Sequence, residues 1–260
     1  MTKRLRLDQL LVQRELAPTR ERAQALILAG AVRVDGDRAD RAAAPVAEDA
    51  ELAVDAGPKY VSRGGDKLAG ALDALGLDVG GKVAIDVGSS TGGFTDVLLQ
   101  RGAIRVHAID VGKGQLDWSL RQDPRVVVHE GVNAREGVPV EEPVDLVVAD
   151  VSFISLRLAL PPSLARLRES GDVVALVKPQ FEAGRDAVGK GGIVRDLETR
   201  ASAVVTVASD LESRGFGVVA ITPSPIAGRE GNREIFVHAR KGAPALGAAA
   251  LSDKAREAAG

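Results

Sequence analysis

The apolar residues in the second part of the chain follow the pattern of a layered fold of strands and helices. From Lys82 onward, short Val-rich runs alternate with stretches of helical spacing. Such nearly continuous apolar runs are typical of parallel strands that are buried on both faces. The predicted strands are residues 83–87, 105–110, 126–129, 145–149, 173–177, 218–222 and 234–239. Because the last two are close in sequence, they predict an antiparallel ending of an otherwise parallel α/β sheet.

The first 55 residues have a different pattern, which predicts a small α+β unit. Leu7, Leu10 and Leu11 have helical spacing, and Thr19 is a candidate N-cap for a second helix that ends at Gly30. Residues 31–34 then alternate as in a strand, and the following Asp-Gly pair is a hairpin signal.

These patterns predict a division of the chain into four parts. We expect a small domain at 1–58, a linker at 59–66, a Rossmann-like domain at 67–242 and a flexible tail at 243–260. The linker is predicted from its glycines, which are common in turns. The tail is rich in Ala and has few large apolar residues, so it is expected to be frayed.

Composition narrows the classes of protein. The chain has 260 residues and a net charge of -2, so a nucleic-acid surface must be a local patch. Cysteine is absent, which excludes disulfides, thiolate zinc sites and cysteine nucleophiles. Charges interrupt the N-terminal segment, and no run approaches the ~20 apolar residues that span a bilayer. We therefore expect a cytoplasmic protein with no membrane partner and no metal.

A glycine-rich loop follows the strand at 83–87 and is the candidate cofactor site. In open α/β sheets, ligands bind at the carboxyl ends of the strands. The GxxxGG spacing differs from the dinucleotide pattern GxGxxG and from the phosphate-binding pattern GxxxxGK[ST]. The loop also has no cation, which favours S-adenosylmethionine, a cofactor with no phosphate and a positive sulfonium. The expected cofactor-binding residues of the loop are Gly88, Ser89, Ser90, Thr91, Gly92, Gly93 and Phe94.

Polar residues near the other strand ends support the same cofactor. Asp86 lies where the methionine ammonium would sit, and Asp110 could accept both ribose hydroxyls. Asn133 follows the third strand and could meet the adenine, and Asp150 is also expected to contact the cofactor. An ordinary glycine turn with capping carboxylates is the alternative. The loop, Asp110 and the strand pattern together favour a methyltransferase.

Four ionisable residues are candidates for catalysis. Asp150 and Lys178 directly follow the fourth and fifth strands, and Glu234 begins the last one. If that strand is antiparallel, its start lies at the same edge of the sheet as the cofactor loop. Lys67 opens the helix before the first strand. Two lysines and two acids can therefore converge on one cleft.

Such a group suits methyl transfer to a sugar hydroxyl, where the site must orient and deprotonate the oxygen. Lys178 is the candidate base, if burial and a neighbouring cation such as Lys67 favour its neutral form. Asp150 and Glu234 could orient the lysines. The segment from Asp150 to Phe153 departs from the [DN]PP[YF] motif of base-amine methyltransferases, and carbon-5 pyrimidine methyltransferases usually need a cysteine. Oxygen is therefore the favoured acceptor.

Six segments together resemble the TlyA family of rRNA cytidine 2′-O-methyltransferases, also known as haemolysin A. The resemblance covers residues 3–240 and rests on RLDQLLV, YVSRGGDK, DVGSSTGGFTD, ADVSFIS, VKPQF and GNREIF. It implies a class I methyltransferase domain of the FtsJ type behind an RNA-binding domain like that of a small-subunit ribosomal protein. It also implies ribosomal RNA or ribosomal subunits as partners. The family's Lys-Asp-Lys-Glu tetrad falls on Lys67, Asp150, Lys178 and Glu234.

The N-terminal segment has a local excess of cations that could contact RNA. Between residues 3 and 22 there are six cations and three acids. In a pair of helices, cations at both helix starts can share one face for phosphate contact. Aromatic residues are absent there, which favours recognition of RNA shape over base stacking. The alternative is a solvated helix surface. The candidate RNA-binding residues are Lys3, Arg4, Arg6, Arg20 and Arg22.

Three other functions compete with an RNA methyltransferase. A small-molecule or protein methyltransferase would use the same loop but would leave the N-terminal unit unexplained. A ribosome-assembly factor without catalysis would not turn over a cofactor. A pore-forming haemolysin is disfavoured, because the sequence has no signal peptide, spanning helix or long series of amphipathic strands.

Overall fold

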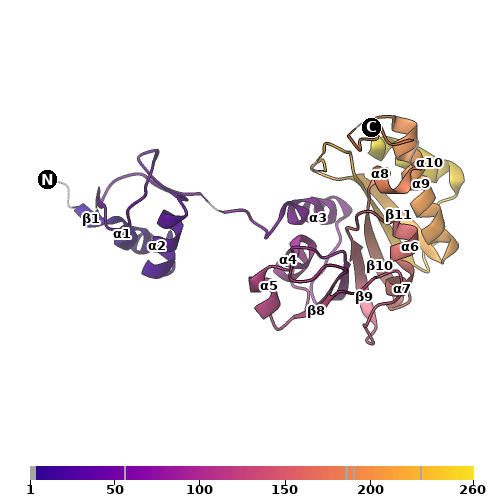
Figure 1. Cartoon of the computed structure of the whole chain (residues 1–260), viewed down its shortest axis with the longest axis horizontal. Helices are drawn as coiled ribbons and strands as arrows, with labels where there is room; N and C mark the ends of the chain where they lie inside the picture. The colour runs from indigo at the N-terminus through magenta and orange to yellow at the C-terminus, as the bar shows by residue number, and fades with distance from the viewer. Residues whose placement is uncertain (1–3, 56, 185–186, 190, 229) are drawn as a thin grey trace. The chain divides into compact units, whose positions relative to one another are not determined.

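The chain folds into two compact units, residues 1–59 and 60–260 (Figure 1). The computed structural model describes residues 4–55, 57–184, 187–189, 191–228 and 230–260. In the smaller unit, two helices and short strands surround a separate apolar core. Its elements are β1 (Arg4–Arg6), α1 (Leu7–Gln13), α2 (Arg20–Leu28), β2 (Val32–Val34), β3 (Asp37–Arg38), β4 (Pro45–Ala47) and β5 (Leu52–Val54).

Local signals in the sequence set the boundaries of these elements. The hydroxyl of Thr19 accepts a hydrogen bond of 3.2 Å from the backbone N–H of Arg22, so it caps α2. Gly30 follows that helix with φ +70°, as the sequence predicts. Asp35 and Gly36 both have positive φ between β2 and β3, which is the conformation of a type I′ hairpin.

The larger unit contains a seven-stranded sheet in the order β11-β12-β10-β9-β6-β7-β8. The strands pair in parallel except β12, which lies antiparallel between β10 and β11. This confirms the predicted Rossmann-like α/β fold and its antiparallel ending. The strands are β6 (Val83–Val87), β7 (Arg105–Asp110), β8 (Val126–Glu130), β9 (Val144–Ala149), β10 (Leu167–Val177), β11 (Phe216–Pro223) and β12 (Ile235–Lys241).

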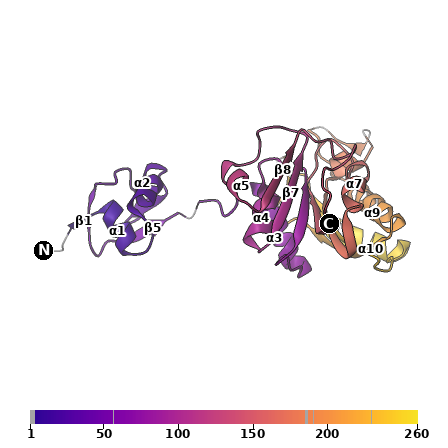
Figure 2. The ribbon, with the colours of Figure 1, turned by 90° about the horizontal axis from the view of Figure 1, so that it is seen from below.

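Helices cover both faces of this sheet (Figure 2). On one face lie α3 (Arg63–Leu75), α4 (Gly93–Gln100) and α5 (Trp118–Gln122). On the other lie α6 (Leu156–Ala159), α7 (Pro161–Leu164), α9 (Leu197–Ser213) and α10 (Ala248–Ala259). A short helix, α8 (Pro179–Glu182), follows β10 at its carboxyl end.

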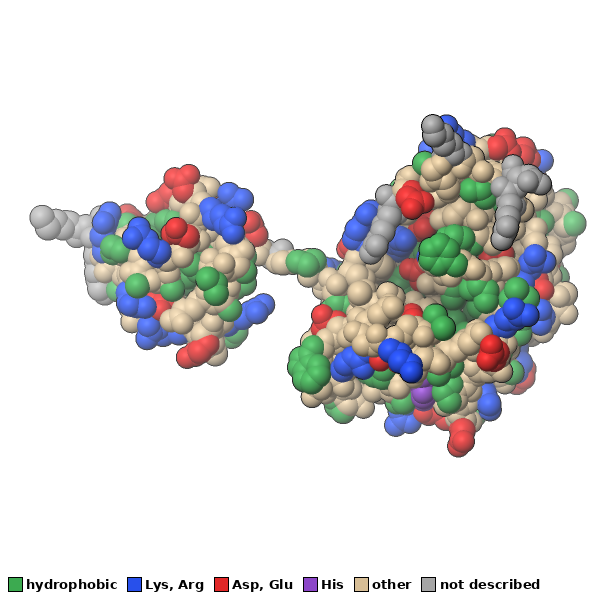
Figure 3. Space-filling model, in the orientation of Figure 1, with side chains coloured by type: hydrophobic (Ala, Val, Ile, Leu, Met, Phe, Trp, Pro, Cys, Tyr) green, Lys and Arg blue, Asp and Glu red, His purple; other side chains and the backbone are tan. Residues whose placement is uncertain are grey.

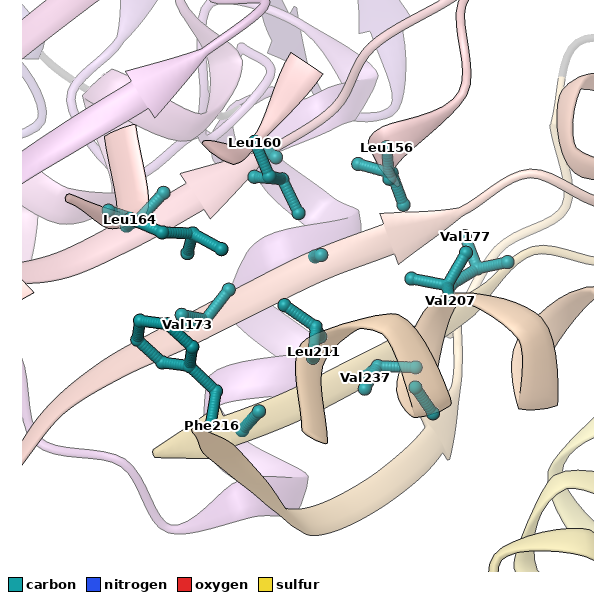
Figure 4. Close-up of a cluster of buried hydrophobic side chains, with 14 of the residues drawn as sticks. Leu156, Leu160, Leu164, Val173, Val177, Val207, Leu211, Phe216 and Val237 are labelled. Carbon is teal, nitrogen blue, oxygen red and sulfur yellow. The ribbon is translucent and has the colours of Figure 1, made fainter. Parts of the chain in front are cut away.

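Alternating strand residues supply the two apolar layers. In β9, Leu146 and Val148 pack beneath α3 and α4, whereas Val147 and Ala149 pack beneath α9. The strands are therefore apolar at successive positions, which explains why they read as continuous Val-rich runs. Figure 4 shows part of the second layer, with Leu156, Leu160, Leu164, Val173, Val177, Val207, Leu211, Phe216 and Val237 pointing toward one another.

The segment expected to be a linker is partly helical. Helix α3 begins at Arg63, so residues 63–66 lie in its first turn and Lys67 does not open the helix. Gly65 is buried there, and a Cβ at this position would lie 2.3 Å from the Cβ of Tyr60. Glycine therefore serves close packing in a helix here, rather than the turn that was predicted from its presence.

The tail also differs from the expectation of a frayed segment, because residues 248–259 form α10. Leu251, Ala255 and Ala259 of this helix are buried against α9. Buried Arg200 of α9 donates hydrogen bonds of 3.0 and 2.8 Å to the carbonyl of Ala259. Small alanines allow close helix packing, so a segment with few large apolar residues still docks.

Replacing Arg200 with alanine is expected to lower the free energy of unfolding by about 3 kcal/mol. The change removes four hydrogen bonds that a buried cation donates to backbone carbonyls. Urea denaturation of the full chain measures the effect. Arg214→Ala is the matched control, because its exposed pair with Asp210 contributes at most about 0.5 kcal/mol. Equal losses in the two variants would contradict the role of Arg200 as a cap for α10.

Candidate active site

The glycine-rich loop joins β6 to α4 at the carboxyl edge of the sheet. The backbone N–H groups of Gly88 and Ser89 donate to the carbonyl of Ile109, at 2.8 and 3.1 Å, which ties the loop to β7. Gly88 has φ +83°, and a Cβ there would lie 2.7 Å from the carbonyl oxygen of Asp150. Only glycine allows the loop to pass so close to the end of β9.

Asp110 holds this loop through two backbone hydrogen bonds. Its carboxylate accepts from the N–H of Ser90 at 2.8 Å and from the N–H of Gly112 at 2.7 Å. Ser90 has φ +47°, a left-handed conformation that the contact with Asp110 helps to hold. A role for Asp110 at a cofactor ribose stays a prediction.

Asp86 lies completely buried beneath the loop, where Thr95 of α4 donates a hydrogen bond of 2.7 Å to it. Its other carboxylate oxygen has no hydrogen-bond partner among the described residues. Burial raises the pKa of Asp86 to about 7, and the nearby charges of Asp150 and Asp110 act in the same direction, against the hydrogen bond from Thr95. The structure therefore joins Asp86 to the first turn of α4, and its contact with a cofactor ammonium stays a prediction.

The pKa of Asp86 predicts how stability depends on pH. In the unfolded chain the carboxyl loses its proton near pH 4, whereas in the folded protein it does so near pH 7. Stability should therefore fall as the pH rises between these values, by at most about 4 kcal/mol. Asp86→Asn should remove this loss. The free energy of unfolding of the variant, relative to that of the natural chain, should therefore be higher at pH 8 than at pH 5. The exposed Asp73→Asn variant is the control, and equal pH profiles in all three proteins would contradict the assignment.

A cavity of about 460 Å³ lies between the loop and the ends of β9, β10 and β12. Figure 3 shows a hollow on this face of the larger unit, with hydrophobic and acidic side chains in it. All four residues of the predicted tetrad line the cavity. The loop contributes Gly88, Ser89, Ser90, Thr91, Gly93 and Phe94.

The tetrad forms two ion pairs in this cavity. The Nζ of Lys67 lies 2.5 Å from a carboxylate oxygen of Glu234, and the Nζ of Lys178 lies 2.6 Å from Oδ1 of Asp150. Glu234 is on the cavity because β12 is antiparallel, so the start of this strand lies at the carboxyl edge of its neighbours. The Nζ of Lys178 also donates to the hydroxyl of Ser152 at 2.9 Å. Both lysines are largely buried, which makes an ordinary solvated surface charge a poor description of either.

Some predicted cofactor residues are not part of the described lining of this cavity, namely Asp86, Gly92, Asp110 and Asn133. Asn133 instead closes a turn: its amide donates to Glu136 at 2.7 Å and accepts from the N–H of Arg135 at 3.2 Å. Contact between Asn133 and an adenine therefore stays a prediction. The sequence indicates the correct strand ends for these residues but not the direction of their side chains.

Other cavity residues were missed by the sequence reasoning. Ser152 and Phe153 follow Asp150, and Gln180 and Phe181 follow Lys178, all on the cavity. The rings of Phe153 and Phe181 are 5.1 Å apart, and Phe153 is 91% exposed. Their positions just after two strand ends were the signal, since successive residues after a parallel strand remain at the ligand-binding edge.

In the smaller unit, two predicted RNA-binding arginines share one buried carboxylate. Arg6 donates to Asp8 at 3.0 and 2.9 Å, and Arg20 donates to it at 3.1 Å. The hydrogen bonds from Arg6, then those from Gln24 and Arg20, hold the pKa of Asp8 well below its usual range against the effect of burial. The structure therefore brings Arg6 and Arg20 to one face. Arg4 and Arg22 are exposed, and Lys3 lies outside the described residues.

The described residues include neither a cluster of metal ligands nor a helix that could span a membrane. No group of three or more His, Asp or Glu side chains there could hold a metal ion. None of the described helices has the length and apolar character needed to cross a bilayer. The expected absence of a metal stays a prediction.

Two family models match the chain. The FtsJ-like methyltransferase model matches residues 60–241, and the S4 domain model matches residues 5–52. A relative from Mycobacterium tuberculosis, named 16S/23S rRNA (cytidine-2′-O)-methyltransferase TlyA, is 48% identical, over 99% of this chain and 98% of its own.

Solved structures agree with this relationship. One from Streptococcus thermophilus, which carries a hemolysin name, has a TM-score of 0.72 and 40% identity, over 99% of this chain and 96% of its own. A structure from Listeria monocytogenes, described as an S-adenosylmethionine-dependent methyltransferase, has a TM-score of 0.50 and 17% identity, over 67% of this chain and 99% of its own. The second likeness shows the fold alone. The chain therefore belongs to the FtsJ-like methyltransferases and, among them, to the TlyA family.

Proposed function

We propose that this enzyme transfers a methyl group from S-adenosylmethionine to the 2′-hydroxyl of a cytidine in ribosomal RNA. The observation that carries the proposal is the pair of lysine–carboxylate contacts in the same cavity as the glycine-rich loop. The name of the Mycobacterium tuberculosis relative supports the nucleotide and the acceptor atom. The match to the S4 domain supports RNA as the substrate, and a cytoplasmic location stays a prediction that follows from it.

The residues around the loop fit S-adenosylmethionine. The loop has no cation, and Gly88 lines the cavity at the end of β6. The buried side-chain oxygen of Gln180 has no partner among the described residues, and a ligand with N–H or O–H groups would satisfy it. When bound, this cofactor supplies a methyl group on a positively charged sulfur, which is already electrophilic.

In this proposal Lys178 first releases its ammonium proton to solvent, and the neutral amine then accepts the proton of the ribose hydroxyl. Asp150 and Ser152 contact its amine from two directions, and thereby fix its position in the cavity. Glu234 holds Lys67 through a single ion pair, directly before the start of β12. The exposed ring of Phe153 is suited to stacking on an unpaired RNA base, since every base has an apolar face.

The smaller unit would bind RNA mainly through phosphate contacts. Arginine side chains are spread over the face of this unit that Figure 3 shows. The carboxylate of Asp8 orients Arg6 and Arg20 together, so that their outer N–H groups can face one phosphate backbone. Backbone contacts set the position of a protein on its nucleic acid without reading the bases.

The test is transfer of tritium from labelled S-adenosylmethionine to purified ribosomal subunits, followed by nucleoside analysis. A labelled 2′-O-methylcytidine is the expected product, and the subunit that carries it identifies the substrate. Transfer to another nucleoside would contradict the cytidine assignment. No transfer to either subunit or to intact ribosomes, with calorimetry still showing cofactor binding, would favour a different acceptor. Absence of both methyl transfer and cofactor binding would favour a non-catalytic role in ribosome assembly.

The hemolysin name of the Streptococcus thermophilus structure raises a second activity. Lysis of red cells by the purified chain in detergent-free buffer tests it directly. We expect none, because the described helices include no membrane span and the described cavity has charged residues suited to transfer chemistry.

A further inference from the structure

The segment from the end of β9 to the first residue of α6, residues 150–156, carries three residues of the cavity: Asp150, Ser152 and Phe153. One end of the segment is tied to Lys178 through Asp150 and Ser152. Both contacts come from the residue that directly follows β10. Among the described contacts, Lys178 therefore meets this segment near its start.

A second tie holds the other end, through Glu182 at the end of α8. The carboxylate of Glu182 accepts a hydrogen bond of 2.6 Å from the hydroxyl of Ser155 and one of 2.7 Å from the backbone N–H of Leu156. Glu182 and Ser155 are both partly buried, so water competes less for these bonds than it would at an open surface. The two segments that follow β9 and β10 are thus joined twice.

Phe153 lies between the two ties and has a conformation that needs support. Its φ is +65°, in the left-handed region that is uncommon for a residue with a large side chain. The residue is 91% exposed, so burial does not hold it. The ring contacts that of Phe181, which belongs to the same helix as Glu182. Such a conformation persists only where the surrounding structure fixes it.

We propose that Glu182 is a positioning residue, which holds residues 150–156 so that Phe153 stays at the mouth of the cavity. It acts through Ser155 and Leu156 and does not line the described cavity itself. The role in catalysis rests on the proposed function, since it assumes that an RNA base meets Phe153. The structural tie does not depend on that function and can be tested separately.

Fluorine NMR of the full chain labelled with 4-fluorophenylalanine tests the tie. The chain has five Phe residues, and Phe153→Leu identifies the signal of interest. In Glu182→Ala, the Phe153 signal should move toward that of a freely mobile ring, because the contact with the Phe181 ring is lost. The signals of buried Phe216 and Phe236 should stay in place, which controls for folding. Glu182→Gln should restore the signal, because an amide can accept from Leu156 and donate to the Ser155 hydroxyl.

Methyl transfer to ribosomal subunits then tests the consequence. Glu182→Ala should raise the KM for RNA toward that of Phe153→Ala, a rise of ~5–150-fold, with cofactor affinity unchanged. Ser155→Ala removes one of the two hydrogen bonds, so its KM for RNA should lie between those of the natural chain and Glu182→Ala. This variant keeps the test available if Glu182→Ala does not fold. An unchanged Phe153 signal in the folded variants would overturn the proposal. If the Phe153 signal moves in the variants but the natural chain itself methylates no RNA, the result supports the tie and rejects the proposed function.

Discussion

Replacing Lys178 with alanine is expected to lower the rate of methyl transfer by ~10²–10⁴-fold, the usual contribution of a general base. Cofactor binding should remain near that of the natural chain, because the glycine-rich loop is held by Ile109 and Asp110 rather than by the lysine. Single-turnover transfer and calorimetry measure the two quantities separately.

Two further variants make this test specific. Lys178→Arg keeps a cation beside Asp150, but a guanidinium cannot accept a proton, so it should be about as slow as alanine. Lys82→Ala is the matched control, since Lys82 also pairs with an acid, Asp172, at 3.2 Å but precedes β6 at the opposite edge of the sheet. Near-normal turnover in Lys178→Ala would show that this lysine is not the base. Near-normal turnover in Lys178→Arg would show that only its positive charge is needed.

Reversing the charge of Arg4 and Arg22 is expected to weaken binding to ribosomal subunits by at least about tenfold at low salt. Each lost phosphate contact should also reduce the slope of log K against log salt by ~0.7–0.9. These two arginines are suitable because they are exposed. Arg6 and Arg20 are unsuitable, since their removal would leave buried Asp8 with fewer partners and confuse binding with folding.

Filter binding across a range of salt concentrations measures both effects for Arg4→Glu/Arg22→Glu. The control is Arg214→Glu/Arg256→Glu, which changes the net charge equally but lies directly after α9 and on α10. Rates at saturating RNA should stay near normal in both proteins. Equal affinity losses in the two double variants would show a general effect of charge and contradict RNA contact at the starts of β1 and α2.

The fold could be predicted because its information is local and repetitive. Residues such as those of β9 must be apolar at successive positions to lie between two helical layers, and few other structures need that pattern. The place of Glu234 followed from one further step, the direction of β12. The tetrad was therefore located by topology and by resemblance together, and its catalytic role stays a proposal.

The parts that could not be predicted depend on contacts across the chain. Whether Asp110 faces a ligand or a loop depends on a few backbone N–H groups. The hydrophobic pattern of the sequence does not predict the positions of these groups. The helical start of α3 depends on a glycine that packs against Tyr60, and α10 depends on Arg200 at its end. In each case a composition typical of loops serves close packing, and tertiary structure decides the outcome.

The position of β12 in the sheet has a consequence for the order in which each molecule matures. During synthesis the N-terminal part emerges and folds first. Residues 1–59 can complete their own core at that stage, whereas Lys67 meets Glu234 only across 167 residues of chain. A nascent chain that ends before β12 therefore has an assembled S4 domain but no complete tetrad. Each molecule gains the means to hold RNA before it gains the means to modify it.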